Sequence, residues 1–372
     1  MEVLLGKTLP ELQEVAQSVG LPKFAGKQLA EWLYVRRVRT FDEMTNISLK
    51  GREALKANYI IGRHAPVREA ISTDGTRKYL FAVSPANPFS PSERGAGGVF
   101  IETVYIPEDD RATLCVSTQA GCKMGCRFCM TGTLGFHGHL PASEILNQIF
   151  EIDALVSPLS LSNLVYMGEG EPMDNIDRVL RSLEIMTAPY ACAWSPKRIT
   201  VSTVGIPAMK RFLDESECHL AVSMHNPFAV ERAQIMPAEK LMSISDVVSL
   251  LKQYDWSHQR RISFEYICWA GKNDTPRHAK ELLRLLKGLN CRINLIRFHE
   301  GVEAISHSST HPLTPSERGQ GGVPFPASDE KQMAWFRDYL SSNGLTTTIR
   351  RSRGEDILAA CGMLVNALNE GA

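Results

Sequence analysis

CVSTQAGCKMGCRFCMTG (residues 115–132) holds four of the nine cysteines of this 372-residue chain. Three of them, Cys122, Cys126 and Cys129, form a CxxxCxxC pattern, and Cys115 stands seven residues ahead of it. An odd number of cysteines at uneven spacing is not a disulfide framework, so the cluster predicts metal binding or catalysis. Four further cysteines lie in apolar or strand-like surroundings and are predicted to be inert: Cys192, Cys218, Cys268 and Cys291.

Strand-like and helical patterns alternate from residue 112 onward. The strand-like runs are TLCVST, SNLVYMG, RITVSTV, HLAVSMH, RRISFEYICWA and CRINLIRFH, with helical runs such as PASEILNQIFEIDALV between them. Six βα units predict an α/β fold with a parallel sheet, either doubly wound or curled into a partial barrel. The cysteine cluster follows the first strand, where the sites of such barrels lie.

The three cysteines alone are compatible with two kinds of metal site. Three thiolates from one loop suit a 4Fe-4S cluster with one iron open to an exogenous ligand. A closed zinc site is the alternative, because His137 or His139 could supply its fourth ligand.

The region before the cluster predicts helices and then a hairpin. Thr8 and Glu11 form a capping box at the start of TLPELQEVAQSVG, which ends at Gly20. GKQLAEWLYVRRV and SLKGREALKANY follow with helical spacing, and RKYLFAV and VFIETVYIP predict two strands. The predicted division of the chain is a helical domain at 1–65, a β-hairpin connector at 66–110, a core at 111–350 and a C-terminal segment at 351–372.

Two similar segments interrupt this pattern. PFSPSERGAGGV (88–99) recurs as PLTPSERGQGGV (312–323), with nine of twelve positions identical. Two distant copies cannot stack into a solenoid. We predict inserted surface loops at 84–98 and about 307–327 with no part in the chemistry; a shared docking segment is the less favoured interpretation.

Charge gives a weak signal. The 41 basic and 41 acidic residues cancel, which argues against nucleic-acid binding through global charge. Local basic runs occur at 34–39 (YVRRVR), 258–261 (HQRR) and 350–353 (RRSR), although a solvated surface explains any one of them equally well. Residues 1–65 carry ten basic against seven acidic side chains, a net charge of +3.

No membrane or export signal is recognisable. The N-terminus lacks the basic start and apolar run of a signal peptide, and no run of about 20 apolar residues occurs. We therefore expect a cytoplasmic protein without membrane association.

The motifs together resemble a known family. CxxxCxxC after the first strand of a βα barrel resembles the radical S-adenosylmethionine superfamily, and MGEGEP (167–172) resembles its Gly-Glu segment. Cys115, the cluster, ETVYIPEDDRATLC and RGEDILAACG, with its lone Cys361, closely resemble the RlmN/Cfr class of RNA methylating enzymes. The resemblance runs from FAGKQLAEWLY and FDEMTNIS to the tail and omits only the two PSERG loops. Without it, Cys361 would be interpreted as a small buried residue of a terminal helix.

The resemblance implies a fold, cofactors and a mechanism. The fold would be a radical S-adenosylmethionine partial (βα)6 barrel, with a 4Fe-4S cluster on the three cysteines and S-adenosylmethionine on the open iron. Cys361 would take a methyl group as a thiolate, and a radical from a second S-adenosylmethionine would join that carbon to adenine. Glu102 would then accept the ring proton, and Cys115 would displace Cys361 through a transient Cys115–Cys361 disulfide.

Further positions follow from matching segments. The resemblance implies that these residues bind S-adenosylmethionine: Gly170, Glu171, Ser202, Ser223, Met224, His225 and His299. A satisfied polar turn is the alternative for the residues at strand ends. The chain departs from the family pattern at Glu169, in GEGEP instead of GMGEP, and at Met224, in SMH instead of SLH. It departs again at Arg297 and His299, in NLIRFH instead of NLIPWN.

The activity implied by the resemblance is methylation of C2 of an adenosine in 23S rRNA, and also in tRNA. The helical domain would bind RNA, and an electron donor such as flavodoxin would reduce the cluster. The enzyme would be a monomer. A paralogue that methylates C8 or another RNA adenosine is the close alternative. A non-enzymatic RNA-binding protein with a structural metal is the alternative from a different class, but it would need neither Cys115 nor Cys361.

Overall fold

The computed structural model describes residues 1–83, 99–156, 161–256, 260–298 and 326–364. The predicted loop 84–98, residues 307–325 of the second predicted loop and His299 lie outside these ranges.

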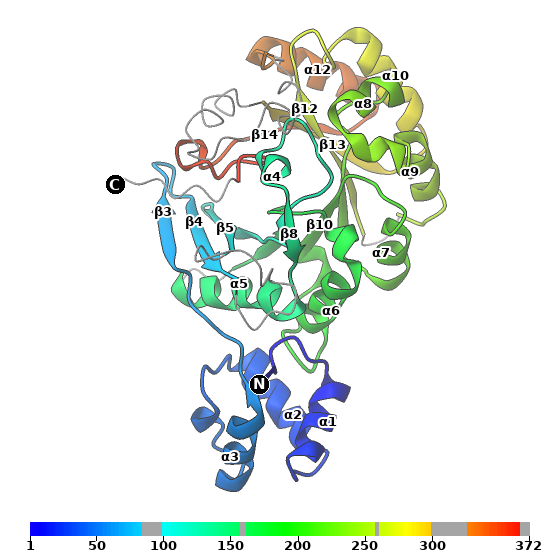
Figure 1. Cartoon of the computed structure of the whole chain (residues 1–372). Helices are drawn as coiled ribbons and strands as arrows, with labels where there is room; N and C mark the ends of the chain where they lie inside the picture. Colours follow the sequence, from blue (N-terminus) through cyan, green and yellow to red (C-terminus); the bar gives the residue numbers. More distant parts are fainter. Residues whose placement is uncertain (84–98, 157–160, 257–259, 299–325, 365–372) are drawn as a thin grey trace.

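Short helices form the N-terminal part, below the barrel in Figure 1. They are α1 (Leu9–Ser18), α2 (Ala25–Ala30), which continues into a π-helical turn, η1 (Glu31–Val35), then η2 (Phe41–Glu43) and α3 (Leu49–Asn58). The Thr8 N–H donates to Glu11 Oε2 at 2.7 Å, which confirms the predicted capping box. The two ends of this part are joined because β1 (Glu2–Val3) pairs in parallel with β2 (Tyr59–Ile60).

One ten-stranded sheet organises the rest of the described chain, in the order β14-β13-β12-β11-β10-β9-β6-β5-β4-β3. The strands at its antiparallel end are β3 (Arg68–Ile71), β4 (Arg77–Ala82) and β5 (Phe100–Pro107), which pairs with β6 (Ala112–Cys115). The parallel strands that follow β6 are β9 (Asn163–Tyr166), β10 (Ile199–Thr203), β11 (His219–Ser223), β12 (Ile262–Cys268), β13 (Cys291–Arg297) and β14 (Thr347–Arg350). The six predicted βα units and the predicted hairpin strands are therefore confirmed, and the hairpin extends the same sheet.

The strand β14 was not among the sequence predictions. Its four residues, TTIR, form the edge of the sheet, and only Thr347 is buried. A strand so short and so little buried carries no clear two-residue hydrophobic alternation, which is the signal for strands in a sequence.

Helices cover the outer side of the curved sheet, which forms a partial barrel (Figure 1). They are α5 (Ala142–Leu155), α6 (Ile176–Thr187), α7 (Met209–Glu215), α8 (Ala229–Ile235), α9 (Ile244–Leu251), α10 (Pro276–Leu286) and α12 (Glu330–Ser342). Shorter elements are β7 (Gln119–Gly121), α4 (Met130–Thr133), β8 (Phe136–His139), η3 (Pro172–Asn175), η4 (Pro196–Arg198), η5 (Pro237–Lys240) and η6 (Glu355–Ile357). The cysteine loop lies between β7 and α4, at the carboxyl ends of the strands.

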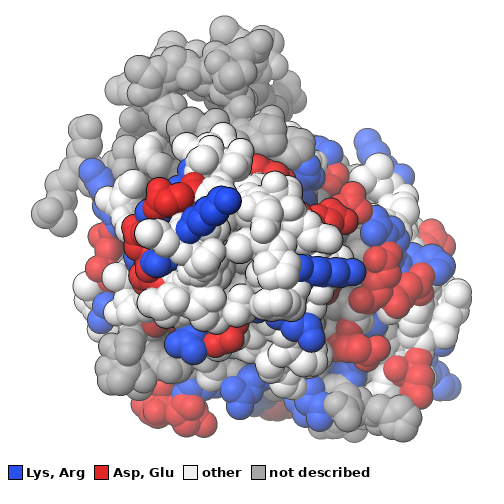
Figure 2. Space-filling model, turned by 90° about the horizontal axis from the view of Figure 1, so that it is seen from below, with Lys and Arg blue, Asp and Glu red and all other residues white. Residues whose placement is uncertain are grey.

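Ion pairs attach the N-terminal part to α5. Arg37 pairs with Asp153, and Arg39 and Arg63 both pair with the buried Glu151. The basic run 34–39 is therefore largely engaged within the protein. Figure 2 views this part from below and shows Lys and Arg interspersed with Asp and Glu, without a continuous basic field.

The turn between β3 and β4 holds the C-terminal segment in place. Asp74 Oδ2 accepts a hydrogen bond from the Gly354 N–H at 3.1 Å. Asp356 in turn accepts hydrogen bonds from Ser72 Oγ at 2.5 Å and from the Thr73 N–H at 3.0 Å. The chain that leaves β14 is thereby fixed beside the hairpin before it reaches Cys361.

Candidate active site

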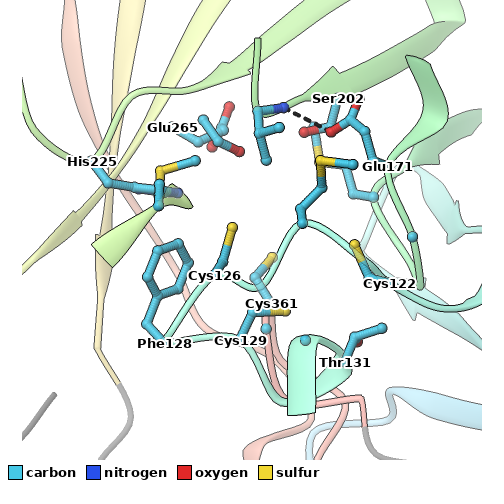
Figure 3. Close-up of a pocket in the computed structure, with 18 of the residues that line it drawn as sticks. Cys122, Cys126, Phe128, Cys129, Thr131, Glu171, Ser202, His225, Glu265 and Cys361 are labelled. Carbon is cyan, nitrogen blue, oxygen red and sulfur yellow. Dashed lines mark hydrogen bonds between the residues drawn. The ribbon is translucent and has the colours of Figure 1, made fainter. Parts of the chain in front are cut away.

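A cavity with about 900 Å³ of empty space lies at the carboxyl ends of the parallel strands (Figure 3). It is lined by nine of the predicted site residues: Cys122, Cys126, Cys129, Gly170, Glu171, Ser202, Ser223, His225 and Cys361. The fold thus brings these residues from five separate segments of the chain around one space.

The three cysteines of the CxxxCxxC motif face this cavity from one wound loop (Figure 3). The Cys122 N–H donates to Gly135 O at 3.0 Å, and the Cys129 N–H donates to Cys126 O at 3.1 Å. Burial raises the pKa of all three thiols, that of Cys122 to about 12. Thiols in this environment become thiolates readily only when a metal replaces their protons.

The surroundings fit an iron-sulfur cluster better than a closed zinc site. Neither His137 nor His139 lines the cavity, and His139 Nδ1 is bonded to Gln119 Nε2 at 3.0 Å. Among the described residues, no three His, Cys, Asp or Glu side chains are close enough to share a single metal ion. Three thiols facing an open cavity are the donor set for a 4Fe-4S cluster that leaves one iron accessible.

The Gly-Glu segment has a fixed conformation on the wall opposite the C-terminal segment. Gly170 has φ +95°, and a Cβ atom there would lie 2.4 Å from the Gln119 side chain, so only glycine fits. Glu171 accepts hydrogen bonds from the Val204 N–H at 2.8 Å and from the Met173 N–H at 3.0 Å. Burial outweighs these bonds and raises the pKa of Glu171 to about 7.

His225 is held as a neutral hydrogen-bond donor. Its Nδ1 accepts the Ile267 N–H at 3.0 Å, so the proton of the neutral ring is on Nε2. Burial lowers its pKa to about 3, with Arg232 as the second cause. The ring packs edge-on against Phe128, with the ring centroids 4.8 Å apart. Phe128, which lies within the cysteine motif, thus connects the cluster loop to β11.

Met224 does not line the cavity. Its side chain is fully buried, and its carbonyl oxygen accepts a hydrogen bond from Arg232 Nε at 2.9 Å. Arg232 also donates to the carbonyls of Val204 and Ser223, which ties the ends of β10 and β11 together. Sequence reasoning missed this arginine because its helical position, in AVERAQI, looks like that of a solvated charge.

Cys361 is exposed and lies in an irregular segment, so the alternative of a small buried residue in a terminal helix was wrong. The segment is attached to the cluster loop, because the Met130 N–H donates to Gly362 O at 2.8 Å. Cys115 packs against a small cluster of buried residues that includes Val104 and Ala359, the latter two residues before Cys361. Burial raises the pKa of Cys115 to about 12, with the nearby Cys361 as a further cause. All nine cysteines are free.

Glu102 does not line the cavity, but its strand places it on the face that carries Cys115. Glu102 and Val104 are two residues apart on β5 and share one face, and Val104 is directly opposite Cys115 on β6. The Glu102 carboxylate is buried in an ion pair with Lys78 Nζ at 2.9 Å. Sequence analysis identified Glu102 but not the lysine that pairs with it.

Glu169 and Arg297, two further departures from the family pattern, do not line the cavity either. Glu169 is fully buried, and its carboxylate accepts the N–H groups of Glu102 at 2.7 Å and Gly121 at 3.2 Å. Its charge nevertheless acts on the cluster loop, since it is one of the causes that raise the pKa of Cys129. Arg297 is 54% exposed and does not line the cavity.

Two charged residues in the cavity were not predicted. Glu265 Oε1 accepts hydrogen bonds from Asn294 and Ser263, whereas its buried Oε2 has no hydrogen-bond partner among the described residues. Arg350 Nη1 lies 3.8 Å from that oxygen. An acidic residue inside the buried run ISFEYIC was the available signal for Glu265, because unpaired charges are rarely buried without a function.

Comparison with known proteins adds an independent result. Residues 3–61 match the family model described as "Ribosomal RNA large subunit methyltransferase N-terminal domain". A Bacteroides fragilis protein named "Probable dual-specificity RNA methyltransferase RlmN" is 54% identical over 99% of this chain and 97% of its own length. A Syntrophobacter fumaroxidans protein named "Dual-specificity RNA methyltransferase RlmN" is 37% identical over 96% of both chains.

A solved structure shows the same architecture. The crystal structure of a radical SAM methyltransferase from Sphaerobacter thermophilus superposes with a TM-score of 0.83 at 33% identity, and covers 98% of this chain and 99% of its own. Among the described residues, no helix combines the length and apolarity needed to cross a membrane.

Proposed function

The chain belongs to the RlmN family of RNA methyltransferases, and from this premise we propose that it methylates C2 of an adenosine in 23S rRNA and in tRNA. One observation carries the proposal: Cys361, from the end of the chain, lines the same cavity as the three cysteines of the cluster motif. A structural metal site does not need a fourth, exposed thiol from a segment about 230 residues beyond the cluster motif. Methyl transfer through a cysteine requires such a thiol.

The cavity has the residues to hold the cofactors of this class. Cys122, Cys126 and Cys129 would hold a 4Fe-4S cluster, and Gly170, Glu171, Ser202, Ser223 and His225 would bind S-adenosylmethionine. Bound together, the cluster and S-adenosylmethionine supply the methyl group and the one-electron chemistry that an unreactive ring carbon needs. Met224 contributes its backbone rather than its side chain, and His299 is proposed by resemblance alone.

The residues of the chain have separable roles in this proposal. Cys361 Sγ carries the carbon that becomes bonded to adenine. Glu102, which forms an ion pair with Lys78, accepts the proton of the ring carbon. Cys115 then attacks Cys361 Sγ, which releases the methylated base and leaves a Cys115–Cys361 disulfide that must be reduced before the next cycle. The packing of Cys115 beside Ala359 supports this pairing.

Mass spectrometry of rRNA and tRNA nucleosides from a deletion strain tests the proposal. Loss of 2-methyladenosine, restored by the wild-type gene but not by a Cys361→Ala variant, is the expected result. An unchanged 2-methyladenosine level would contradict it, and loss of a C8-methylated adenosine instead would favour the paralogue. A cytoplasmic location, a monomeric state and an electron donor such as flavodoxin are further proposals that accompany this activity.

A further inference from the structure

A second hollow, with about 1510 Å³ of empty space, meets the active-site cavity at three residues that line both: Ile296, Arg350 and Cys361. It passes the amino ends of β9, β10 and β11 and the chain that follows β14. We call it the basic groove, because apart from Arg350 it is lined by six cationic residues: Arg111, Lys197, Arg198, Arg261, Arg351 and Arg353.

Most of this positive charge has no counter-charge. Glu108 is the only acidic residue among those that line the basic groove, and it pairs with Arg111. Arg353 lies 3.8 Å from Asp74. The remaining four cations are exposed and form no ion pair within the described part of the chain: Lys197, Arg198, Arg261 and Arg351.

These four residues come from three distant segments, before β10, before β12 and after β14. Arg261, from the basic run 258–261, therefore meets the arginines of the run 350–353 in one groove. The third run, 34–39, is engaged in ion pairs with α5. In an otherwise neutral protein, unpaired cations collected in one hollow repel one another and attract a polyanion.

We propose that the basic groove binds the phosphodiester backbone of the RNA strand that carries the target adenosine. The groove ends at Cys361, so a strand held there would present an unstacked base to the thiol while its phosphates contact the four unpaired cations. The inference rests on the proposed function, since it names where the substrate of that same site is held.

Binding measurements on the reconstituted holoenzyme test it without requiring turnover. The probe is a fluorescently labelled RNA hairpin with an unpaired adenosine in its loop, titrated at several salt concentrations. Two double variants, Lys197→Gln/Arg198→Gln and Arg261→Gln/Arg351→Gln, each remove two charges from the groove. The matched control, Lys280→Gln/Lys287→Gln, removes two exposed charges from α10 and its C-terminal end, on the outer layer of the barrel.

Each groove variant should weaken binding about tenfold or more near 0.15 M salt, while the control binds like wild type. The slope of log K against log salt should fall in magnitude by about 0.7 for each phosphate that the variant no longer neutralises, which a folding defect would not produce. If the groove variants keep the wild-type affinity and slope while the wild-type enzyme methylates RNA, the groove proposal is overturned and the proposed function stands. If the wild-type holoenzyme neither binds nor methylates rRNA or tRNA, both are overturned.

Discussion

Lys78 Nζ lies 2.9 Å from Glu102 Oε1, and the two side chains are 9% and 1% exposed. The pair joins β4 to β5, on the face of the sheet that also carries Cys115. Each charge compensates the other in a buried environment, so the lysine holds in place the carboxylate to which we assign proton acceptance.

Replacement of Lys78 by Met should therefore lower both stability and activity. Breaking a buried ion pair from one side typically costs about 3–5 kcal/mol, and the Glu102 carboxylate loses the cation that holds it in place. Thermal unfolding measures the loss of stability, and the rate of single-turnover methylation measures the loss of activity. Lys78→Arg keeps the cation and is the control; full activity of Lys78→Met at neutral pH would show that the ion pair is not needed for proton transfer.

The bond from Gly354 to Asp74 is expected to position Cys361. Burial raises the pKa of Asp74, but hydrogen bonds from Thr76 and Gly354 outweigh it and bring the value to about 2. Asp74→Ala removes the acceptor and should slow methylation by about tenfold, since misplacement of a reacting group by about 1 Å is costly. Asp74→Asn keeps an acceptor oxygen and should retain most of the activity. Equal methylation rates for the two variants would show that this hydrogen bond does not contribute to catalysis.

Removal of the second thiol should trap the protein on RNA. With Cys115→Ala the adduct between Cys361 and adenine cannot be resolved, so a denaturing gel should show protein and RNA migrating together. The double variant Cys115→Ala/Cys361→Ala is the control and should run free. An inactive Cys115→Ala protein that also runs free of RNA would argue against the resolving role of Cys115.

Metal analysis distinguishes the cluster from zinc. Protein reconstituted without oxygen should be brown and contain about four irons per chain. Cys126→Ala should lose the colour and most of the iron, whereas Cys268→Ala, at a buried cysteine away from the cavity, should keep both. A colourless protein with one zinc per chain would exclude the radical mechanism.

The contact between His64 and α5 predicts a pH-dependent stability. His64 Nε2 lies 2.8 Å from Glu144 Oε2, and this hydrogen bond raises the pKa of His64 above its usual value of 6.5 despite burial. The stabilisation is therefore complete below about pH 6.5 and is lost as the pH rises through the raised value. The melting temperature should fall between pH 6 and pH 8 in the wild type, and His64→Gln should show a smaller fall. Parallel curves for the two proteins would refute this.

Sequence alone determined the features that depend on local spacing. The CxxxCxxC motif, the six βα units and the capping box of Thr8 and Glu11 are short-range patterns, and each appears in the structure where it was predicted. Resemblance supplied most of the remaining site residues, because whole segments such as RGEDILAACG matched a family pattern.

Tertiary structure decided which charges act together. The partnership of Lys78 with Glu102, the burial of Glu169 behind the cavity and the convergence of Arg261 and Arg351 in one groove join residues from separate strands and loops. No spacing rule connects them, because strand order and register, not distance along the chain, determine which side chains meet. The sequence shows which thiols the chain carries for the proposed methylation, and only the fold shows which charged groups lie beside them.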